Sequence, residues 1–124
     1  MLKCFAPIGG GVGDAWYDWL RIPLFRKIPS LVEDYGAQVR IVSQCHCLGA
    51  VTELLETCPY VHEVIEEPWA PPSHELGQRW NSVDADGYIP IGRDDLLYQA
   101  GVRTLNLRSP SIYLTDAERD YVSG

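Results

Sequence analysis

Hydrophobic residues occur in short runs whose repeat alternates between that of a strand and that of a helix. Residues 2–8 form an apolar run that stops at a glycine cluster, which predicts a buried strand entering a tight turn. Beyond the turn, Trp16, Leu20 and Leu24 recur at a spacing of four, which predicts an amphipathic helix from Asp14. A strand, a glycine turn and a helix together begin a βαβ unit.

Two prolines divide the helical region that follows. Pro23 and Pro29 predict a kink or consecutive short helices, because proline lacks an N–H and clashes with the preceding turn. The segment Ser30-Leu31-Val32-Glu33 has the spacing of a capping box, which predicts that a helix restarts there. Gly36 fits the end of that helix. Apolar spacing then predicts a strand, a helix and a strand, over 38–43, 48–57 and 62–66.

The last third of the chain continues the alternation after a polar interruption. Residues 68–87 are rich in Pro, Ser, Gly and Asp, and only a short helix at 75–80 is predicted within them. The remaining predictions are an extended segment at 88–91, a helix at 94–100 ended by Gly101, a short strand at 103–107 and a terminal helix from Asp116. Alternating strands and helices predict an α/β fold with a mostly parallel sheet and helices on both faces.

Composition and charge narrow the class of protein. The 124 residues are 46% hydrophobic and 22% charged, which is typical of one packed globular domain. The net charge is −7, and residues 1–40 carry five basic and four acidic side chains, whereas residues 41–80 carry one basic and six acidic. An acidic chain without a Lys/Arg run is a poor match for phosphate backbones, so nucleic acid is not expected as a partner.

The N-terminus and the cysteines bear on location and on metal binding. Residues 1–7 have one charge and an apolar run too short for a signal peptide, so we expect a cytoplasmic protein without a transmembrane segment and with reduced thiols. The segment Cys45-His46-Cys47, with Cys58 and His62, has the residue types of a zinc site. A C-x-C spacing is not the usual knuckle, and a predicted helix separates the two groups, so a metal protein is the less favoured alternative.

The glycine turn is the main candidate for chemistry. The run Gly9-Gly10-Gly11-Val12-Gly13-Asp14 follows a strand and precedes a helix, where open α/β sheets bind anions or sugar hydroxyls. It is neither the dinucleotide fingerprint nor a P-loop, because Asp14 occupies the third glycine position and no Gly-Lys-Ser/Thr follows. Asp14 has two interpretations, an N-cap worth about 1 kcal/mol and a general base. Trp16 is either core packing or a stacking platform for a sugar ring.

Three segments in order resemble the N-terminal domain of glycosyltransferase family 9, the heptosyltransferase-like enzymes of the GT-B fold. The first is Gly10-Gly11-Val12-Gly13-Asp14, with Pro23 and Arg26 similar to a Pro-x-x-Arg further along. The second, Cys58-Pro59-Tyr60-Val61-His62-Glu63-Val64-Ile65, is similar to Asn-Pro-Tyr-Val-Asp-Glu-Val-Ile. The third comprises 95–102 and 111–118, which resemble the stretch that closes the first domain.

The resemblance implies both a fold and an activity. It implies a Rossmann-like acceptor-side domain over 1–115, with the interdomain helix starting at 116–124 and a C-terminal donor-binding domain absent from these residues. The reaction implied is transfer of a sugar from a nucleotide donor to a hydroxyl of a sugar or glycolipid acceptor, without an obligatory cofactor or metal. Peripheral contact with a membrane is compatible with such an acceptor.

The resemblance also assigns residues and leaves an alternative open. It implies that Asp14 is the catalytic base and that Gly10, Gly11, Val12, Gly13 and Trp16 bind the acceptor. Departures from the family include the later position of Pro23 and the tryptophans at 16 and 19, so heptose-lipid specificity does not carry over. These residues alone are expected to be inactive. The alternative is a non-catalytic Rossmann-like module that binds a partner.

Overall fold

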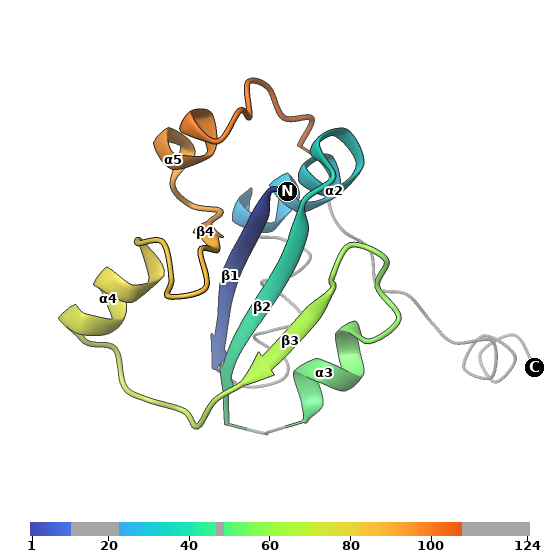
Figure 1. Ribbon diagram of the computed structural model, residues 1–124. Coiled ribbons are helices and arrows are strands. Elements are labelled where there is room, and N and C mark those ends of the chain that lie inside the picture. The colour runs from blue at the N-terminus through green and yellow to red at the C-terminus, as the bar shows by residue number, and fades with distance from the viewer. Residues whose placement is uncertain (11–22, 47–48, 108–124) are drawn as a thin grey trace, which may run out of the picture.

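The computed structural model describes residues 1–10, 23–46 and 49–107. Within these ranges four parallel strands form one sheet, in the order β3-β2-β1-β4. The strands are β1 (Lys3–Gly10), β2 (Gln38–Cys45), β3 (Glu63–Glu66) and β4 (Ile89–Pro90). Figure 1 shows β1, β2 and β3 running in one direction, so that their carboxyl ends lie at one edge. The predicted α/β fold with a parallel sheet is confirmed.

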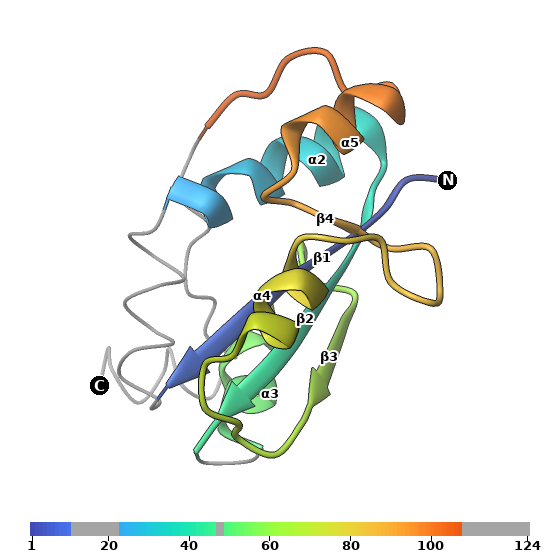
Figure 2. The ribbon, with the colours of Figure 1, turned by 90° about the vertical axis from the view of Figure 1, so that its left-hand side faces the viewer.

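Short helices connect the strands. They are the 3₁₀ helix η1 (Pro23–Lys27) and the α-helices α2 (Ile28–Tyr35), α3 (Ala50–Leu55), α4 (His74–Trp80) and α5 (Asp94–Gln99). Pro23 begins η1 and Pro29 lies in the first turn of α2, which confirms the prediction of consecutive short helices. Gly36 ends α2 with a left-handed φ of 65°, as predicted for a helix stop. Figures 1 and 2 show α2 and α5 side by side near the N-terminal end of the sheet.

One face of the sheet carries the hydrophobic core. Side chains alternate between faces along a strand, and in this register Ala6 is paired with Ile41 on the same face. Both belong to one buried cluster with residues from α2, α3 and α5. Its members from β1, β2 and the helices include Cys4, Ile8, Val39, Phe25, Ile28, Leu31, Val51, Leu55 and Leu97. We call this side the core face.

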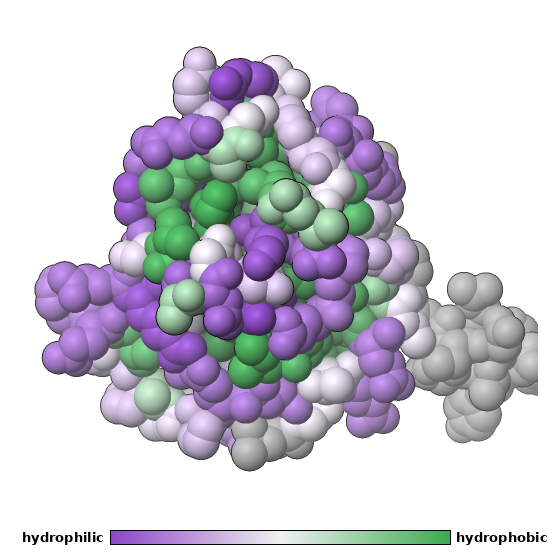
Figure 3. All heavy atoms as spheres, viewed as in Figure 1, coloured by the Kyte–Doolittle hydropathy of each residue, from purple (hydrophilic) through white to green (hydrophobic). Residues whose placement is uncertain are grey.

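The opposite side, which we call the α4 face, is built differently. Phe5 and Val42 are buried, yet neither belongs to the main cluster, because both point away from it. The ring of Phe5 lies 6.5 Å from that of Trp80, centroid to centroid, which places α4 over this side. No residue of α4 is buried, and Figure 3 shows hydrophilic surface where this helix projects. Helices therefore cover both faces, one of them thinly.

Two local predictions were wrong. The helix does not restart at Ser30, since α2 begins at Ile28; the Ser30 hydroxyl donates to Asp34 Oδ2 over 2.6 Å instead of capping the helix. Residues 103–107 are not a strand. Their backbone groups bond to side chains of α2, because the Tyr35 hydroxyl accepts from the N–H groups of Arg103 and Thr104 and donates to the Thr104 carbonyl. These bonds hold the segment against α2 rather than beside β4.

Candidate functional site

The described part of the predicted glycine turn lies at the carboxyl end of β1. Gly9 and Gly10 are the last residues of that strand and are paired with Gln44 and Cys45 of β2. The neighbouring strands β2 and β4 lie on either side of β1, so the chain order reverses here, which is where open α/β sheets bind ligands. The predicted site residues Gly11, Val12, Gly13, Asp14 and Trp16, and the boundary at 115–116, lie outside the described residues.

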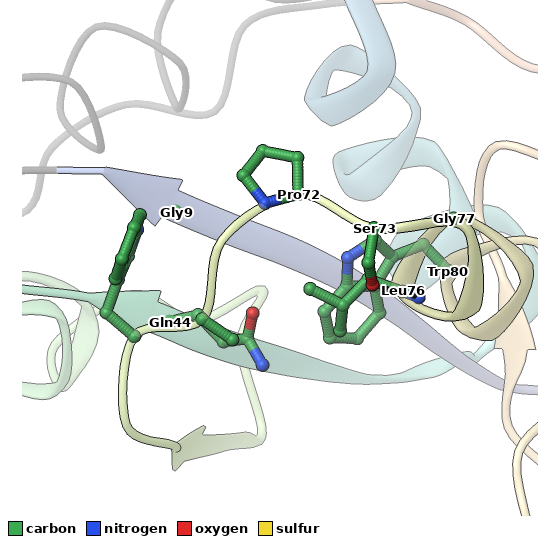
Figure 4. A pocket seen from close by; sticks show the side chains of 9 residues that line it. Gly9, Gln44, Pro72, Ser73, Leu76, Gly77 and Trp80 are labelled. Carbon is green, nitrogen blue, oxygen red and sulfur yellow. Dashed lines mark hydrogen bonds between the residues drawn. The ribbon is translucent and has the colours of Figure 1, made fainter.

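A hollow of about 310 Å³ opens beside Gly9 on the α4 face. Its size is within the range of small-molecule sites. Figure 4 shows Ser73, Leu76 and Trp80 together at one side of the hollow, with Gly9 and the side chain of Gln44 toward the other. The lining consists of strand ends, the loop before α4 and α4 itself: Gly9, Gln44, Trp69, Ala70, Pro72, Ser73, Leu76, Gly77 and Trp80. We call it the tryptophan pocket.

Two neighbouring side chains contact Trp80. Its ring packs against Phe5 of β1, and the Arg79 guanidinium lies 4.6 Å from the centroid of the indole ring. Arg79 in turn donates two hydrogen bonds, of 2.7 and 2.5 Å, to the carboxylate of Glu67. A two-bond fork of this kind fixes the orientation of the arginine. Trp80 is therefore a positioned wall of the pocket rather than a loose surface side chain.

Gln44 is joined to the same network. Its Nε2 donates to Glu67 Oε1 over 3.0 Å, so one carboxylate connects the end of β2 to α4. The hydrogen bond from Arg79 lowers the pKa of Glu67, and the bond from Gln44 adds to it against partial burial. Glu67 is thus ionised at neutral pH and orients the Gln44 amide, whose carbonyl oxygen is an acceptor at the pocket wall.

Trp69 provides the second indole. Its ring stacks on that of His46 with centroids 4.7 Å apart and planes inclined by 26°. The side chain still has 46% exposure, which is unusual for a large aromatic residue. An exposed indole on the lining of a hollow is available to a second ring.

Among the described residues, the pocket lining contains no ionisable side chain. Glu67 and Arg79, which contact the lining residues Gln44 and Trp80, are paired with each other. Phosphate groups are bound in proteins by Arg, Lys or free helix N–H groups, and here the N-terminal Leu76 N–H is bonded to Ser73 Oγ over 3.1 Å. The pocket therefore suits an uncharged ring with hydroxyl groups better than an anion.

A second hollow on the α4 face, of about 350 Å³, is charged. Arg40 crosses it, lies 3.8 Å from the ring centroid of Tyr88, and pairs with the carboxylates of Glu63, Asp84 and Asp86 at 2.9, 3.4 and 3.0 Å. Asp84 also accepts from two backbone N–H groups of its own loop. Its charged groups are engaged with one another, so we interpret this hollow as structural.

Polar atoms without partners lie at the carboxyl edge on the core face. Ser43 is 1% exposed and its hydroxyl has no hydrogen bond in the structure. Its register partner Glu66 accepts from the Gly49 N–H and the Thr52 hydroxyl through Oε2, whereas its buried Oε1 has no partner. Buried polar atoms are normally bonded, so Ser43 Oγ and Glu66 Oε1 are exceptions among the described residues.

The described members of the cysteine and histidine constellation do not form one group, and Cys47 lies outside the described residues. Cys45 ends β2 at the carboxyl edge, whereas His62 accepts a hydrogen bond from the Val39 N–H at the opposite end of the same strand. Six residues of strand span roughly 20 Å. Cys4, Cys45 and Cys58 are buried, and burial raises the pKa of Cys4 to about 12 and also raises that of Cys58, which disfavours the thiolate that metals require. The described residues contain no group of three or more potential metal ligands.

Sequence reasoning missed most of the tryptophan pocket. Sequence patterns did not predict Gln44, Trp69 or Trp80 as site residues. In β2, however, Arg40 and Gln44 place polar side chains on one face of the strand, which is unusual for a central parallel strand. That alternation was the available signal.

Comparisons with protein-family models, with curated proteins and with solved structures give no match. The described residues also contain no helix long and apolar enough to cross a membrane. The structure therefore supports the α/β architecture, while the family resemblance stays a prediction from the residues that carry it.

Proposed function

We propose that this chain is the acceptor-side domain of a glycosyltransferase that transfers a sugar from a nucleotide donor to an acceptor hydroxyl. The observation that carries the proposal is the position of the glycine-ended strand. β1 is central, ends in Gly9-Gly10 where the strand order reverses, and borders a pocket whose described lining has two indoles and no ionisable side chain. Such a lining matches the neutral, hydroxyl-bearing rings that an acceptor domain holds.

The chemistry needs a base on the acceptor hydroxyl. Asp14 follows the glycine turn by sequence, and the resemblance assigns it that role. In the transfer, the acceptor oxygen bonds to the anomeric carbon of the donor sugar while the bond from that carbon to the phosphate oxygen breaks and the nucleoside diphosphate leaves. A carboxylate that takes the hydroxyl proton in this step contributes about 10²- to 10⁴-fold. The donor nucleotide is assigned by the same resemblance to a second domain, and no metal is required by it.

Substitution of Asp14 tests the proposal in the natural gene product. Asp14→Asn keeps the N-cap oxygen, since Asn caps helices about as well as Asp, but removes the base. Release of nucleoside diphosphate from UDP-, ADP- and GDP-sugars, with lipid and oligosaccharide extracts as acceptors, should fall by about 10²-fold or more in this variant. Asp18→Asn serves as the matched control in the same predicted helix.

Two results would contradict the proposal. Transferase activity that is unchanged in Asp14→Asn would remove the assigned base. Absence of acceptor-dependent release with every donor would favour the alternative, a non-catalytic module that uses the tryptophan pocket for binding alone.

A further inference from the structure

We infer that the tryptophan pocket is a binding site for one uncharged pyranose ring, with Trp69 as its stacking surface and Gln44 and Ser73 as its hydrogen-bonding groups. The choice of a sugar over other rings rests on the proposed function. The site itself is argued from the described lining of the pocket, in which Gly9 is the one residue that comes from the glycine turn.

The aromatic geometry suits one face of a ring. The C–H face of a pyranose packs on an indole, and Trp69 is prepared for this because His46 supports one side of it while 46% of the side chain remains exposed. Trp80 is fixed by Phe5 and Arg79, as described above, and closes the other end. A ligand that stacks on a fixed surface loses less entropy on binding than one that must order its own site.

The polar groups are few and oriented. The Gln44 amide is held by Glu67, which leaves its carbonyl oxygen as an acceptor for a sugar hydroxyl. Ser73 Oγ accepts from the Leu76 N–H, so its own hydrogen is available to donate. One oriented acceptor and one donor on an apolar lining can fix the orientation of a neutral polyol.

Gly9 offers a way to fill the pocket without disturbing the fold. A Cβ built on Gly9 meets no atom within 4 Å, and Gly9 shares its face of β1 with Phe5, on the side of the pocket. Gly9→Val therefore places a branched side chain into the space for the ring. A β-branched residue is also favourable in a strand.

Direct binding tests this inference without any transfer reaction. The indole N–H signals of the full chain are followed by ¹H–¹⁵N NMR during titration with methyl β-D-glucopyranoside, methyl β-D-galactopyranoside and methyl α-D-mannopyranoside. At least one of these pyranosides should shift the indole N–H signals of Trp69 and Trp80. Each signal is assigned by its disappearance when the corresponding tryptophan is substituted. Binding should weaken about three- to tenfold in Trp69→Ala, from the loss of stacking, and more in Gly9→Val. Tyr98→Ala removes another exposed aromatic residue, outside this pocket, and should leave binding unchanged.

Other outcomes overturn the inference. Binding of adenosine but of no pyranoside assigns the pocket to a nucleobase, and equally tight binding of cyclohexanol makes it a merely apolar hollow. No binding of any probe removes the site. If Trp69→Ala does not fold, Gly9→Val alone decides the outcome. The two proposals fail separately: pyranoside binding without transferase activity keeps the pocket, whereas transfer with an unchanged KM in Gly9→Val keeps the enzyme and removes the pocket.

Discussion

Ile41 and Val42 are neighbours on β2 and are both buried, yet they belong to different structures. Ile41 points into the core face and contributes to one continuous apolar cluster. Val42 points to the α4 face, between Arg40 and Gln44, where ion pairs, cation–π contacts and a hollow replace the apolar packing. One face of the sheet thus holds the fold together, and the other presents polar groups that a packed core would exclude.

The difference indicates where function can change without loss of the fold. Core packing tolerates little alteration, because a lost methylene leaves a cavity. The α4 face is covered by a helix with no buried residue and is fixed mainly by side-chain hydrogen bonds. Substitutions on this face are expected to alter binding more than stability, and the following predictions test that contrast.

The largest effect is expected from the core face. Ile41→Ala should lower the free energy of unfolding by about 2–5 kcal/mol, because the site is fully enclosed by the cluster. Val42→Ala, one residue away on the other face, should cost only about 1–2 kcal/mol, from the transfer of two methyl groups. Urea denaturation measures both. Equal losses would contradict the division into two faces.

The charged part of the α4 face should contribute less. Arg40→Leu keeps an apolar side chain but removes the partner of three carboxylates, one of them on Asp84 at 26% exposure, so we expect a loss of about 1–3 kcal/mol. Arg93→Leu is the control, because the Arg93–Asp95 pair is exposed and should contribute less than about 1 kcal/mol. A smaller loss for Arg40 than for Arg93 in thermal or urea unfolding would refute this ranking.

Substitutions at two glycines test the backbone at the end of α2, which packs on the core face, and at the end of β1, beside the pocket on the α4 face. Gly36 ends α2 in the left-handed region, with φ of 65°, so Gly36→Ala should cost about 1–2 kcal/mol. Gly9 has no positive φ, and an added Cβ meets nothing within 4 Å. Gly9→Ala should therefore leave stability unchanged or raise it by up to about 0.5 kcal/mol, since alanine is less flexible when unfolded. Strong destabilisation by Gly9→Ala in urea titration would show that the pocket is filled.

The smallest effect concerns pH. The pKa of Glu67 is lowered in the fold by its bond to Arg79, so its contribution is complete above the ordinary value of 4.5 and is lost as the pH falls through the lower folded value. The stability difference between wild type and Glu67→Gln should be below about 1 kcal/mol at pH 7, because Arg79 is 46% exposed. It should shrink below pH 4.5. Glu75→Gln, which replaces another exposed carboxylate of α4, serves as the control. A difference between wild type and Glu67→Gln that widens on acidification would contradict the assignment.

Much of the fold follows from local pattern. The glycine-ended strand 2–8, the strand at 38–43, the helix stop at Gly36 and the short helix at 75–80 correspond to β1, β2, the end of α2 and α4. Each of these elements depends on residues that are close to one another in the sequence. The predictions of a capping box at Ser30 and a strand at 103–107 were wrong for a different reason. The Ser30 hydroxyl accepts from the Asn106 N–H, and the Tyr35 hydroxyl bonds to the backbone of residues 103 and 104. Each of these bonds joins residues about 70 positions apart in the sequence.

The sequence by itself determined the class of fold and the glycine-ended strand β1, because hydrophobic period and backbone freedom are local properties. Only the tertiary structure decided the tryptophan pocket. The chain returns from β3 to β4 across β2 and β1, which lays residues 67–88 on the face opposite the core. That crossing brings Glu67 and Arg79 to Gln44, and Trp80 to Phe5. Hydrophobic periodicity does not predict such contacts, because they join segments that are brought together by the path of the crossover connection.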